Sequence, residues 1–411
     1  MLKLLKQNKM FRVLVLYQFF TSLGAAMFSM FILLSVHLIY QNPIYTGIAG
    51  FLIAAPRVLS IAAGPIVDRR NKVTIIRITT LFEFIVLSLL AFTPLQEQLG
   101  VLFTFAVIFA YSVLFLFEEP AGTALLPQIV HEEEIMKANS LMSIVIMVGG
   151  LGIGIVLLLS LGTDVNFRFL YGFSAVFVVF AFIVSLFLKS GTAKETVKKS
   201  SSGYLADIKE GVKFIRGSIL LYLILAAVTM NFVREIAYIN RPMFLEYYVG
   251  AQGYILFSLV GLIGGVFASV FVGTLGNNYK VGRLLFALIV PAGIVRIIFA
   301  LVVPVQLIAG LIAVAVFSAL IYAVGIIFSS LNQKVPNNDM VGRVNTMSAT
   351  FSSIAVALGA LVGGFLGSIV PDAGHIFIYE GISYGVIGLL IILVPSIRKL
   401  PKMNEINKSG E

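Results

Sequence analysis

Between two long apolar runs, the chain carries the stretch Gly64-Pro65-Ile66-Val67-Asp68-Arg69-Arg70-Asn71-Lys72. This stretch holds one acid and three cations, and charges at such density cannot lie in hydrocarbon. We therefore expect it to lie at a membrane surface, as a tight turn between two membrane spans.

The composition predicts a membrane protein. The 411 residues are 59% hydrophobic and only 12% charged, with a mean hydropathy of +1.02, which is more apolar surface than a water-soluble fold can hide. The chain has no cysteine, and its three histidines are far apart: His37, His131 and His375. We expect no disulfide, thiolate chemistry, metal site or cofactor. The net charge of +10 falls mostly in short loops, which favours a membrane surface over nucleic acid as the partner.

Twelve apolar runs are long enough to cross about 30 Å of hydrocarbon, which takes roughly 20 helical residues. They cover approximately residues 12–40, 47–66, 73–93, 100–118, 136–161, 167–188, 219–248, 254–275, 284–302, 305–331, 342–370 and 375–394. We read the first run as an uncleaved span, because no small-residue cleavage site follows its basic start. Most of the 29 lysines and arginines fall on the side of the N-terminus, so we expect a multi-pass protein of the cell membrane with both termini cytoplasmic.

A polar segment divides the spans into two sets of six. We expect an N-terminal bundle over 1–189, a cytoplasmic linker over 190–217 and a C-terminal bundle over 218–411. Within the linker, apolar residues at spacings of three and four predict an amphipathic helix on the membrane surface. They are Leu205, Ile208, Val212 and Ile215.

The two halves resemble each other in sequence. Lys137-Ala138-Asn139-Ser140-Leu141-Met142 begins the fifth span, and Arg343-Val344-Asn345-Thr346-Met347-Ser348 begins the eleventh, about half the chain later. Gly273–Arg283 is a degenerate copy of the opening stretch, without its acid. The expected fold is an all-α polytopic membrane protein with two pseudo-symmetric six-helix bundles, the architecture of alternating-access transporters.

The pattern Gly-x-x-x-Asp-Arg-x-x-Lys in the opening stretch resembles the loop between the second and third helices of the major facilitator superfamily. In that family the loop clamps two helices and helps to latch one conformation. The resemblance implies a gating role for Gly64, Asp68, Arg69, Arg70 and Lys72. This sequence departs from the usual pattern at Asn71, where glycine is common, and at Lys72, where arginine is common.

Other segments resemble the macrolide-efflux and multidrug-exporter branch of that superfamily. They are Glu118-Glu119-Pro120-Ala121, Leu126 to Val130, Asp207 to Gly211 and Gly342-Arg343-Val344. The resemblance implies a secondary active exporter of hydrophobic or amphipathic compounds, drug- or macrolide-like, working by proton-coupled antiport. Two departures stand against a full match. Tyr111 stands where such exporters often have an arginine, and Gly149–Gly154 lacks their proline, so we interpret these glycines as helix-packing positions.

Ionisable groups within the spans each cost at least a few kcal/mol unless they are paired or hydrated, so they are the candidates for proton coupling or buried ion pairs. They are Arg57, Glu83, Glu118, Glu119, Arg234, Glu235, Arg296 and Glu380. Arg57 and Glu83 lie equally far from the opening stretch on successive spans, about 16 Å deep at 1.5 Å per residue. We expect them to form a charge pair, either fixed and structural or rearranged by a proton.

By resemblance, the first, fourth, seventh and tenth spans line a central cavity. Their candidate lining residues are Gln18, Thr21, Met27, Met30, Tyr111, Phe115, Asn231 and Tyr322. Aromatic and methionine surfaces suit bulky amphipathic ligands better than sugars. The sequence does not distinguish such positions from lipid-facing or core ones.

The sequence bears on four other functions. A nucleotide-binding loop of the form G-x-x-x-x-G-K-[ST] is absent from the sequence, which disfavours direct ATP drive, and no catalytic constellation suggests an enzyme. A lipid, lysophospholipid or siderophore transporter of the same fold remains open, and so does a non-transporting membrane receptor. The expected partners are the lipid bilayer, a small amphipathic substrate and protons, with the chain acting as a monomer.

Overall fold

The apolar runs form long α-helices in the computed structural model, which describes residues 2–59, 63, 66–67, 70–92, 100–131, 134–160, 167–189 and 211–406. No β-strand occurs in these residues. α-Helices suit the hydrocarbon core of a membrane, because each backbone N–H and C=O finds its hydrogen-bond partner within the same segment.

The helices follow the predicted order. The first half contains α1 (Leu2–Gln7), α2 (Lys9–Tyr40), α3 (Pro43–Val58), α5 (Lys72–Phe92), α7 (Gly100–Ile129), α8 (Ile135–Ser160) and α9 (Phe167–Ser185). The second half contains α11 (Leu220–Ile239), α12 (Arg241–Asn278), α13 (Val281–Val302), α14 (Leu307–Lys334), α15 (Asn338–Ile369), α16 (Gly374–Leu393), α17 (Pro395–Arg398) and the 3-10 turn η2 (Met403–Glu405). In the described part, ten helices are long and apolar enough to cross a membrane, and shorter apolar helices cover Pro43–Val58 and Leu141–Gly152. The chain has the twelve-helix fold that its sequence predicts.

The chain divides into two compact units. The first contains residues 1–41 and 48–197, and the second contains residues 42–47 and 198–411. The predicted linker boundary falls at residues 190–210, which lie outside the described residues, together with most of the predicted amphipathic helix. Residues 211–216 are helical, and the side chains of Val212 and Ile215 pack into the core of the second unit.

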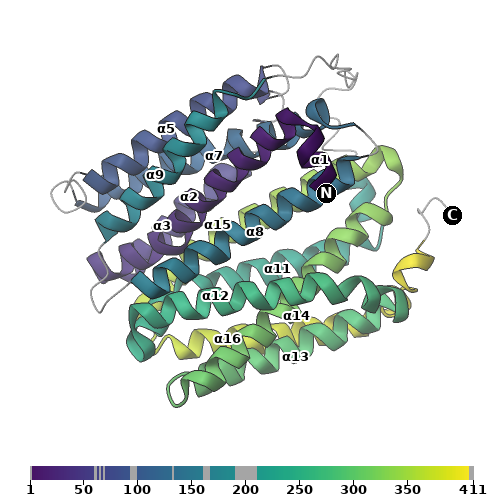
Figure 1. Ribbon diagram of the computed structural model, residues 1–411. Helices are drawn as coiled ribbons and strands as arrows, with labels where there is room; N and C mark the ends of the chain where they lie inside the picture. Colours follow the sequence, from purple (N-terminus) through teal and green to yellow (C-terminus); the bar gives the residue numbers. More distant parts are fainter. Residues whose placement is uncertain are drawn as a thin grey trace. The chain divides into compact units, whose positions relative to one another are not determined.

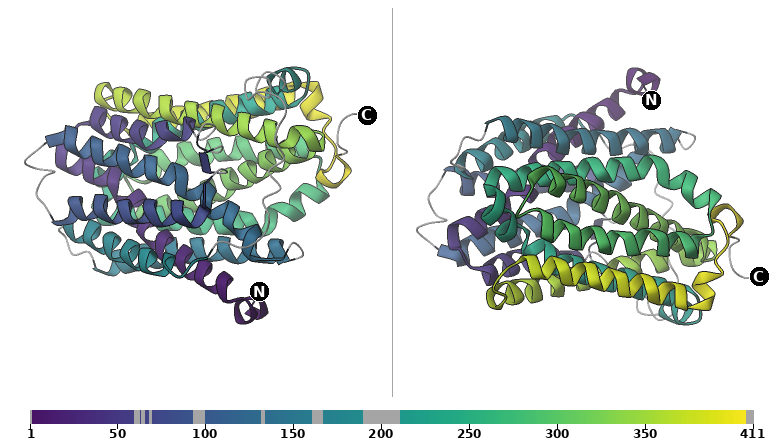
Figure 2. Two further views of the ribbon diagram at one scale, coloured as in Figure 1. Left: turned by 90° about the horizontal axis from the view of Figure 1, so that it is seen from above. Right: turned by 90° about the horizontal axis from the view of Figure 1, so that it is seen from below.

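The two units repeat one packing scheme. In the first, α2 packs against α8 and α9, and α5 packs against α7 and α9. In the second, α11 packs against α15 and α16, and α13 packs against α14 and α16. Each of these four pairings in one unit has its counterpart at the same place in the chain order of the other, and the long helices of each unit lie side by side in every view (Figures 1 and 2). Pseudo-symmetry of the two halves is thus visible in their helix pairings.

The seventh and eighth spans are divided differently from the prediction. The predicted span 219–248 is interrupted at Asn240, because Pro242 in the first turn of α12 lacks the N–H that would continue α11. Helix α12 then passes through Gly250, whose φ of 70° and ψ of 176° are non-helical. This positive φ is readily adopted by glycine, so the chain changes direction there without a loop.

The side chain of Arg77 fixes the end of α9. Its guanidinium donates hydrogen bonds to the backbone carbonyls of Ser185 (3.1 Å), Leu186 (3.0 Å) and Leu188 (2.8 Å). These carbonyls lie at and just beyond the last turn of the helix, where carbonyls lack their usual helical partners, and a cation there also suits the helix dipole. Arg77 therefore links α5 to the C-terminal end of α9, shortly before the polar segment that begins at residue 190.

Candidate functional site

Two helices of the first unit bring acidic side chains together in an apolar interior. Glu83 on α5 and Glu118 on α7 are 3% and 8% exposed, and Tyr17 on α2 beside them is 2% exposed. Helices α5 and α7 pack along each other, which brings the two carboxyl groups within hydrogen-bonding reach. These three helices thus enclose a polar cluster well inside the bundle.

The hydrogen bonds of the cluster do not use every carboxyl oxygen. Oε1 of Glu118 accepts a hydrogen bond from the hydroxyl of Tyr17. That hydroxyl lies 3.2 Å from Oγ1 of Thr80, which donates to the carbonyl of Ile76 at 2.7 Å. Among the described residues, Oε1 of Glu83 has no hydrogen-bond partner although it is buried. One acceptor of the pair is therefore free to take up a proton or a water molecule.

Two carboxylate anions cannot hydrogen-bond to each other, since neither has a hydrogen to donate. A hydrogen bond between Glu83 and Glu118 therefore requires a proton on one of the two carboxyl groups. Tyr111, on α7 two turns before Glu118, is buried and close enough to interact electrostatically with both groups. The side chain at position 111, beside the two acids, is thus a phenol rather than a cation.

The expected pair of Arg57 and Glu83 is not formed. The Arg57 side chain is exposed, and its guanidinium lies over the ring of Phe115, 5.7 Å from the ring centroid. Glu83 is buried and faces Glu118 instead. Equal depth along two helices does not determine which way each side chain points around its helix, and that direction decided the partner here.

A second charged cluster lies in the second unit. Nε of Arg296 on α13 contacts Oε2 of Glu380 on α16 at 2.5 Å, and both side chains are buried. The guanidinium also lies within 4.8 Å of the centroids of three rings, those of Phe299, Phe317 and Phe377. A cation enclosed by ring faces and one carboxylate is well compensated, which favours a fixed pair.

The remaining charged candidates are more scattered. Glu119 is exposed on α7, next to Glu118 in sequence but not part of the buried pair. Arg234 is exposed on α11 and acts electrostatically on Glu380. Glu235 is buried, with its Cβ close to Gly359 of α15. The adjacent Arg234 and Glu235 therefore point in different directions, as helix geometry requires.

The gating stretch is described only in part. Gly64, Asp68 and Arg69 lie outside the described residues; Arg70 is exposed, and Lys72 is buried at the start of α5. Oδ1 of Asn71 accepts hydrogen bonds from the backbone N–H of Val73 (2.9 Å) and Thr74 (3.3 Å). Asn71 is therefore the N-cap of α5, a role that explains an asparagine at this position.

The predicted cavity residues have varied surroundings. Thr21 is buried and donates to backbone carbonyls of its own helix, Tyr111 is buried against Phe28, and Phe115 contacts Arg57. Gln18 and Asn231 are half-buried, while Tyr322 is half-exposed and packs on Gly265. The side chains of Met27 and Met30 lie outside the described set.

Sequence reasoning missed Tyr17 and Thr80. A signal was present, because Tyr17 lies one turn before Thr21, and Thr80 lies one turn before Glu83, so each stands on a polar helix face. The pairing of Arg296 with Glu380 was likewise not predicted. No group of three or more histidine, aspartate or glutamate side chains suited to a metal ion occurs in the described part of the chain.

Comparisons with known proteins agree on the fold. The family model described as Major Facilitator Superfamily matches residues 14–360. The nucleoside transporter NupG is similar in structure with a TM-score of 0.77 and 13% identity, covering 95% of this chain and 99% of that one. A D-xylose-proton symporter matches with a TM-score of 0.70 and 14% identity, over 96% and 98% of the two chains. The peptide transporter POT in complex with sulfate matches with 0.70 and 14% identity, over 96% of both chains. No curated protein matches by sequence.

Proposed function

The chain belongs to the major facilitator superfamily, and from that premise we propose that it is a proton-coupled exporter of hydrophobic or amphipathic compounds, drug- or macrolide-like in character. It is a membrane transporter rather than an enzyme. The observation that carries the coupling proposal is the buried contact between Glu83 and Glu118. A carboxyl pair in an apolar interior, with one free acceptor oxygen, is a place where protons bind and leave as access to water changes.

The pair gives the first unit a charge that depends on its protons. With one proton it is negative and costly to keep out of water, and with two protons it is neutral. A conformation that opens the pair to the acidic side would therefore load a proton, and one that opens it to the cytoplasm would release it. Antiport follows if substrate leaves the cytoplasm while the loaded pair returns its proton inward.

The energetics permit such coupling. One proton moving through about 100 mV supplies about 2.3 kcal/mol, enough to sustain roughly a 50-fold substrate gradient. A D-xylose-proton symporter shares the fold, so the fold accommodates proton coupling. Whether the substrate moves with or against the proton depends on this chain's own residues.

The proposed substrate class rests on the resemblance to drug exporters and on the few polar groups among the candidate cavity residues. Tyr111, Phe115 and Tyr322 offer ring surfaces, whereas Gln18, Thr21 and Asn231 are the polar ones. The Thr21 hydroxyl donates to backbone carbonyls of its own helix, those of Tyr17 and Gln18, which leaves it little capacity for a sugar-like ligand. We also propose that the protein is a monomer of the cytoplasmic membrane with both termini in the cytoplasm, because the basic loops lie on that side.

Transport of a dye panel by purified protein in proteoliposomes tests the proposal. An imposed pH gradient should drive accumulation of at least one amphipathic dye, and Glu83→Gln should abolish the effect of the gradient. Glu119→Gln, which changes the exposed neighbour of Glu118, is the matched control and should behave like wild type. Dye movement that ignores the gradient would reject antiport, and failure to move any compound would favour a membrane receptor.

A further inference from the structure

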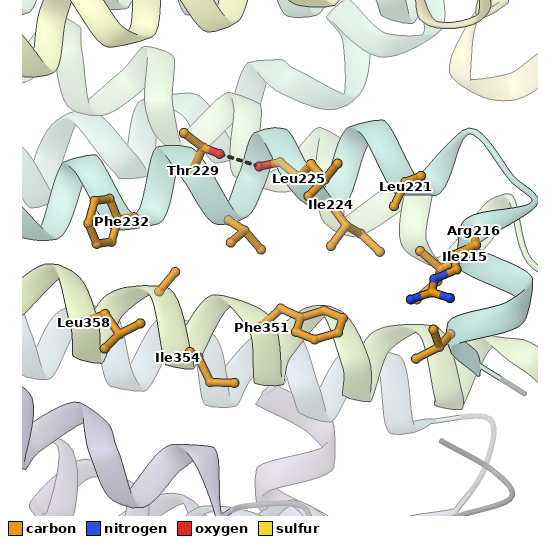
Figure 3. Close-up of a pocket in the computed structure, with 13 residues that line it drawn as sticks. Ile215, Arg216, Leu221, Ile224, Leu225, Thr229, Phe232, Phe351, Ile354 and Leu358 are labelled. Atoms are coloured by element: carbon orange, nitrogen blue, oxygen red, sulfur yellow. Dashed lines mark hydrogen bonds between the residues drawn. The ribbon is translucent and has the colours of Figure 1, made fainter. Parts of the chain in front are cut away.

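An apolar groove runs between α11 and α15 in the second unit (Figure 3). It has a volume of about 480 Å³. Its walls include Ile224, Leu225 and Phe232 of α11 and Phe351, Ile354 and Leu358 of α15. Thr229 also lines it, but its hydroxyl donates to the carbonyl of Leu225 at 2.9 Å. The walls therefore offer no free hydroxyl to a polar ligand.

A seam of glycines closes one end of the groove. Gly359, Gly363 and Gly367 recur every four residues on α15, and a Cβ at Gly363 would lie 2.9 Å from the Cα of Ile236 on α11. Nδ2 of Asn240 donates to the carbonyl of Gly363 across this contact at 2.8 Å. Small residues at such spacing let helices approach closely. The two helices therefore touch along the seam.

A cationic side chain lies at the other end of the groove. Figure 3 shows the guanidinium of Arg216 reaching into the gap between the helices, opposite the end where Phe232 and Leu358 lie. Arg216 precedes the first residue of α11 by four positions, so it lies at the edge of the apolar segment. Gly211, which precedes Arg216 in the same helical segment, packs against Arg343 and Met347 of α15. This contact places a second arginine near the same end of the groove.

We propose that this groove binds an acyl chain of an anionic membrane lipid, with the head group held at Arg216. The wall from Leu221 to Phe232 is about 16 Å long at 1.5 Å per residue. That length is about half of the 30 Å hydrocarbon core, which is the share of one leaflet. A site that is apolar along one leaflet's depth and cationic at its surface end matches an anionic lipid in both length and charge.

The proposed lipid is distinct from the transported substrate, although α11 is also the seventh span, which by resemblance borders the substrate cavity. A basic residue near the membrane surface favours an anionic lipid by about fivefold. The bound lipid would lie in the opening between α11 and α15, on the side where the polar segment joins α11. It would fill a gap that helix packing leaves open.

Bromolipid quenching tests this directly, because the chain contains no tryptophan and a single introduced one gives an unmixed signal. Phe351→Trp places the reporter in the groove. The full-length variant is reconstituted in phosphatidylcholine containing a small fraction of either brominated phosphatidylglycerol or brominated phosphatidylcholine. We expect the brominated anionic lipid to quench about fivefold more effectively at equal fraction, and Arg216→Gln in the same background to lose most of that preference.

The matched control is Phe365→Trp, on the exposed face of α15 beyond the glycines Gly359 and Gly363. Its reporter should be quenched equally by the two brominated lipids. Elution of each variant as a single species in detergent confirms that it is folded. Equal quenching of Phe351→Trp by both lipids would overturn the anionic preference, and quenching by neither would mean that something other than lipid fills the groove.

Discussion

Glu83 and Glu118 lie with their carboxyl groups against each other, although they are 35 residues apart on different helices. Among the described residues, the charged group that acts on Glu83 is Glu118, whose own hydrogen-bond partner is the hydroxyl of Tyr17. In the described part of the chain, no counter-ion therefore accompanies Glu83.

Replacing either acid should separate proton coupling from substrate movement. Glutamine keeps the shape and the hydrogen-bonding capacity but cannot ionise. We expect Glu83→Gln and Glu118→Gln to lower gradient-driven transport at least about tenfold, a loss of about 1.4 kcal/mol of coupling. Exchange of labelled for unlabelled substrate at equal pH should stay within about threefold of wild type. Loss of exchange together with gradient-driven transport would point to a structural role instead.

Removing the phenol of Tyr17 should leave a buried acceptor without a donor. Tyr17→Phe deletes the hydrogen bond to Glu118, at a cost of about 1–3 kcal/mol for an unsatisfied buried group. Thermal unfolding in detergent should begin a few degrees lower. Tyr279→Phe, at an exposed position, serves as the control and should not change the midpoint. An unchanged midpoint in both variants would show that water replaces the Tyr17 hydroxyl.

The pair of Arg296 and Glu380 should behave as a closed unit. Glu380→Gln alone leaves the guanidinium without its anion and should cost about 3–5 kcal/mol. Changing both residues to methionine removes both charges and should restore most of that loss, since Phe299, Phe317 and Phe377 surround the site. A double-mutant cycle on unfolding measures this coupling. Additive single and double effects would mean that the two groups stabilise the protein separately.

Glycine at position 363 should be necessary for the close contact of α11 and α15. An added Cβ would lie 2.9 Å from both the Cα and the carbonyl oxygen of Ile236, so Gly363→Ala should destabilise the protein by about 1–3 kcal/mol. The control Gly325→Ala meets no atom within 4 Å and should be neutral or stabilising by about 0.5–1 kcal/mol. Thermal unfolding of the two variants compares them, and equal midpoints would contradict a packing role for the seam.

The spans were predictable because the requirements of hydrocarbon are simple. Long apolar runs and charged turns correspond to helices and their ends, and the helix boundaries agree within a few residues for α5, α8 and α13. The fourth span is an exception, as are the seventh and eighth. The fourth was expected to end at residue 118, yet α7 continues through Pro120 and Pro127 to Ile129. Proline inside a membrane helix is tolerated because neighbouring groups satisfy the carbonyls that it frees.

The candidate site was predictable as a set of residues but not as a set of contacts. The cost of burying charge singled out eight residues. Five of them are buried, namely Glu83, Glu118, Glu235, Arg296 and Glu380, whereas Arg57, Glu119 and Arg234 are exposed. Their partners depend on the rotation of each helix about its axis, which apolar runs without a polar face leave undetermined. The hydroxyl of Tyr17 escaped notice for a related reason, because a tyrosine in an apolar run reads as one more large apolar side chain.

The ion pair of Arg296 and Glu380 has an electrical consequence. A closed pair carries no net charge, so moving it through the membrane potential does no electrical work, whereas one unpaired charge would exchange about 2.3 kcal/mol per 100 mV. This pair can therefore stiffen the second unit without making its motion sensitive to voltage. Under the proposed proton coupling, the charge that responds to voltage would be carried by the protons of Glu83 and Glu118.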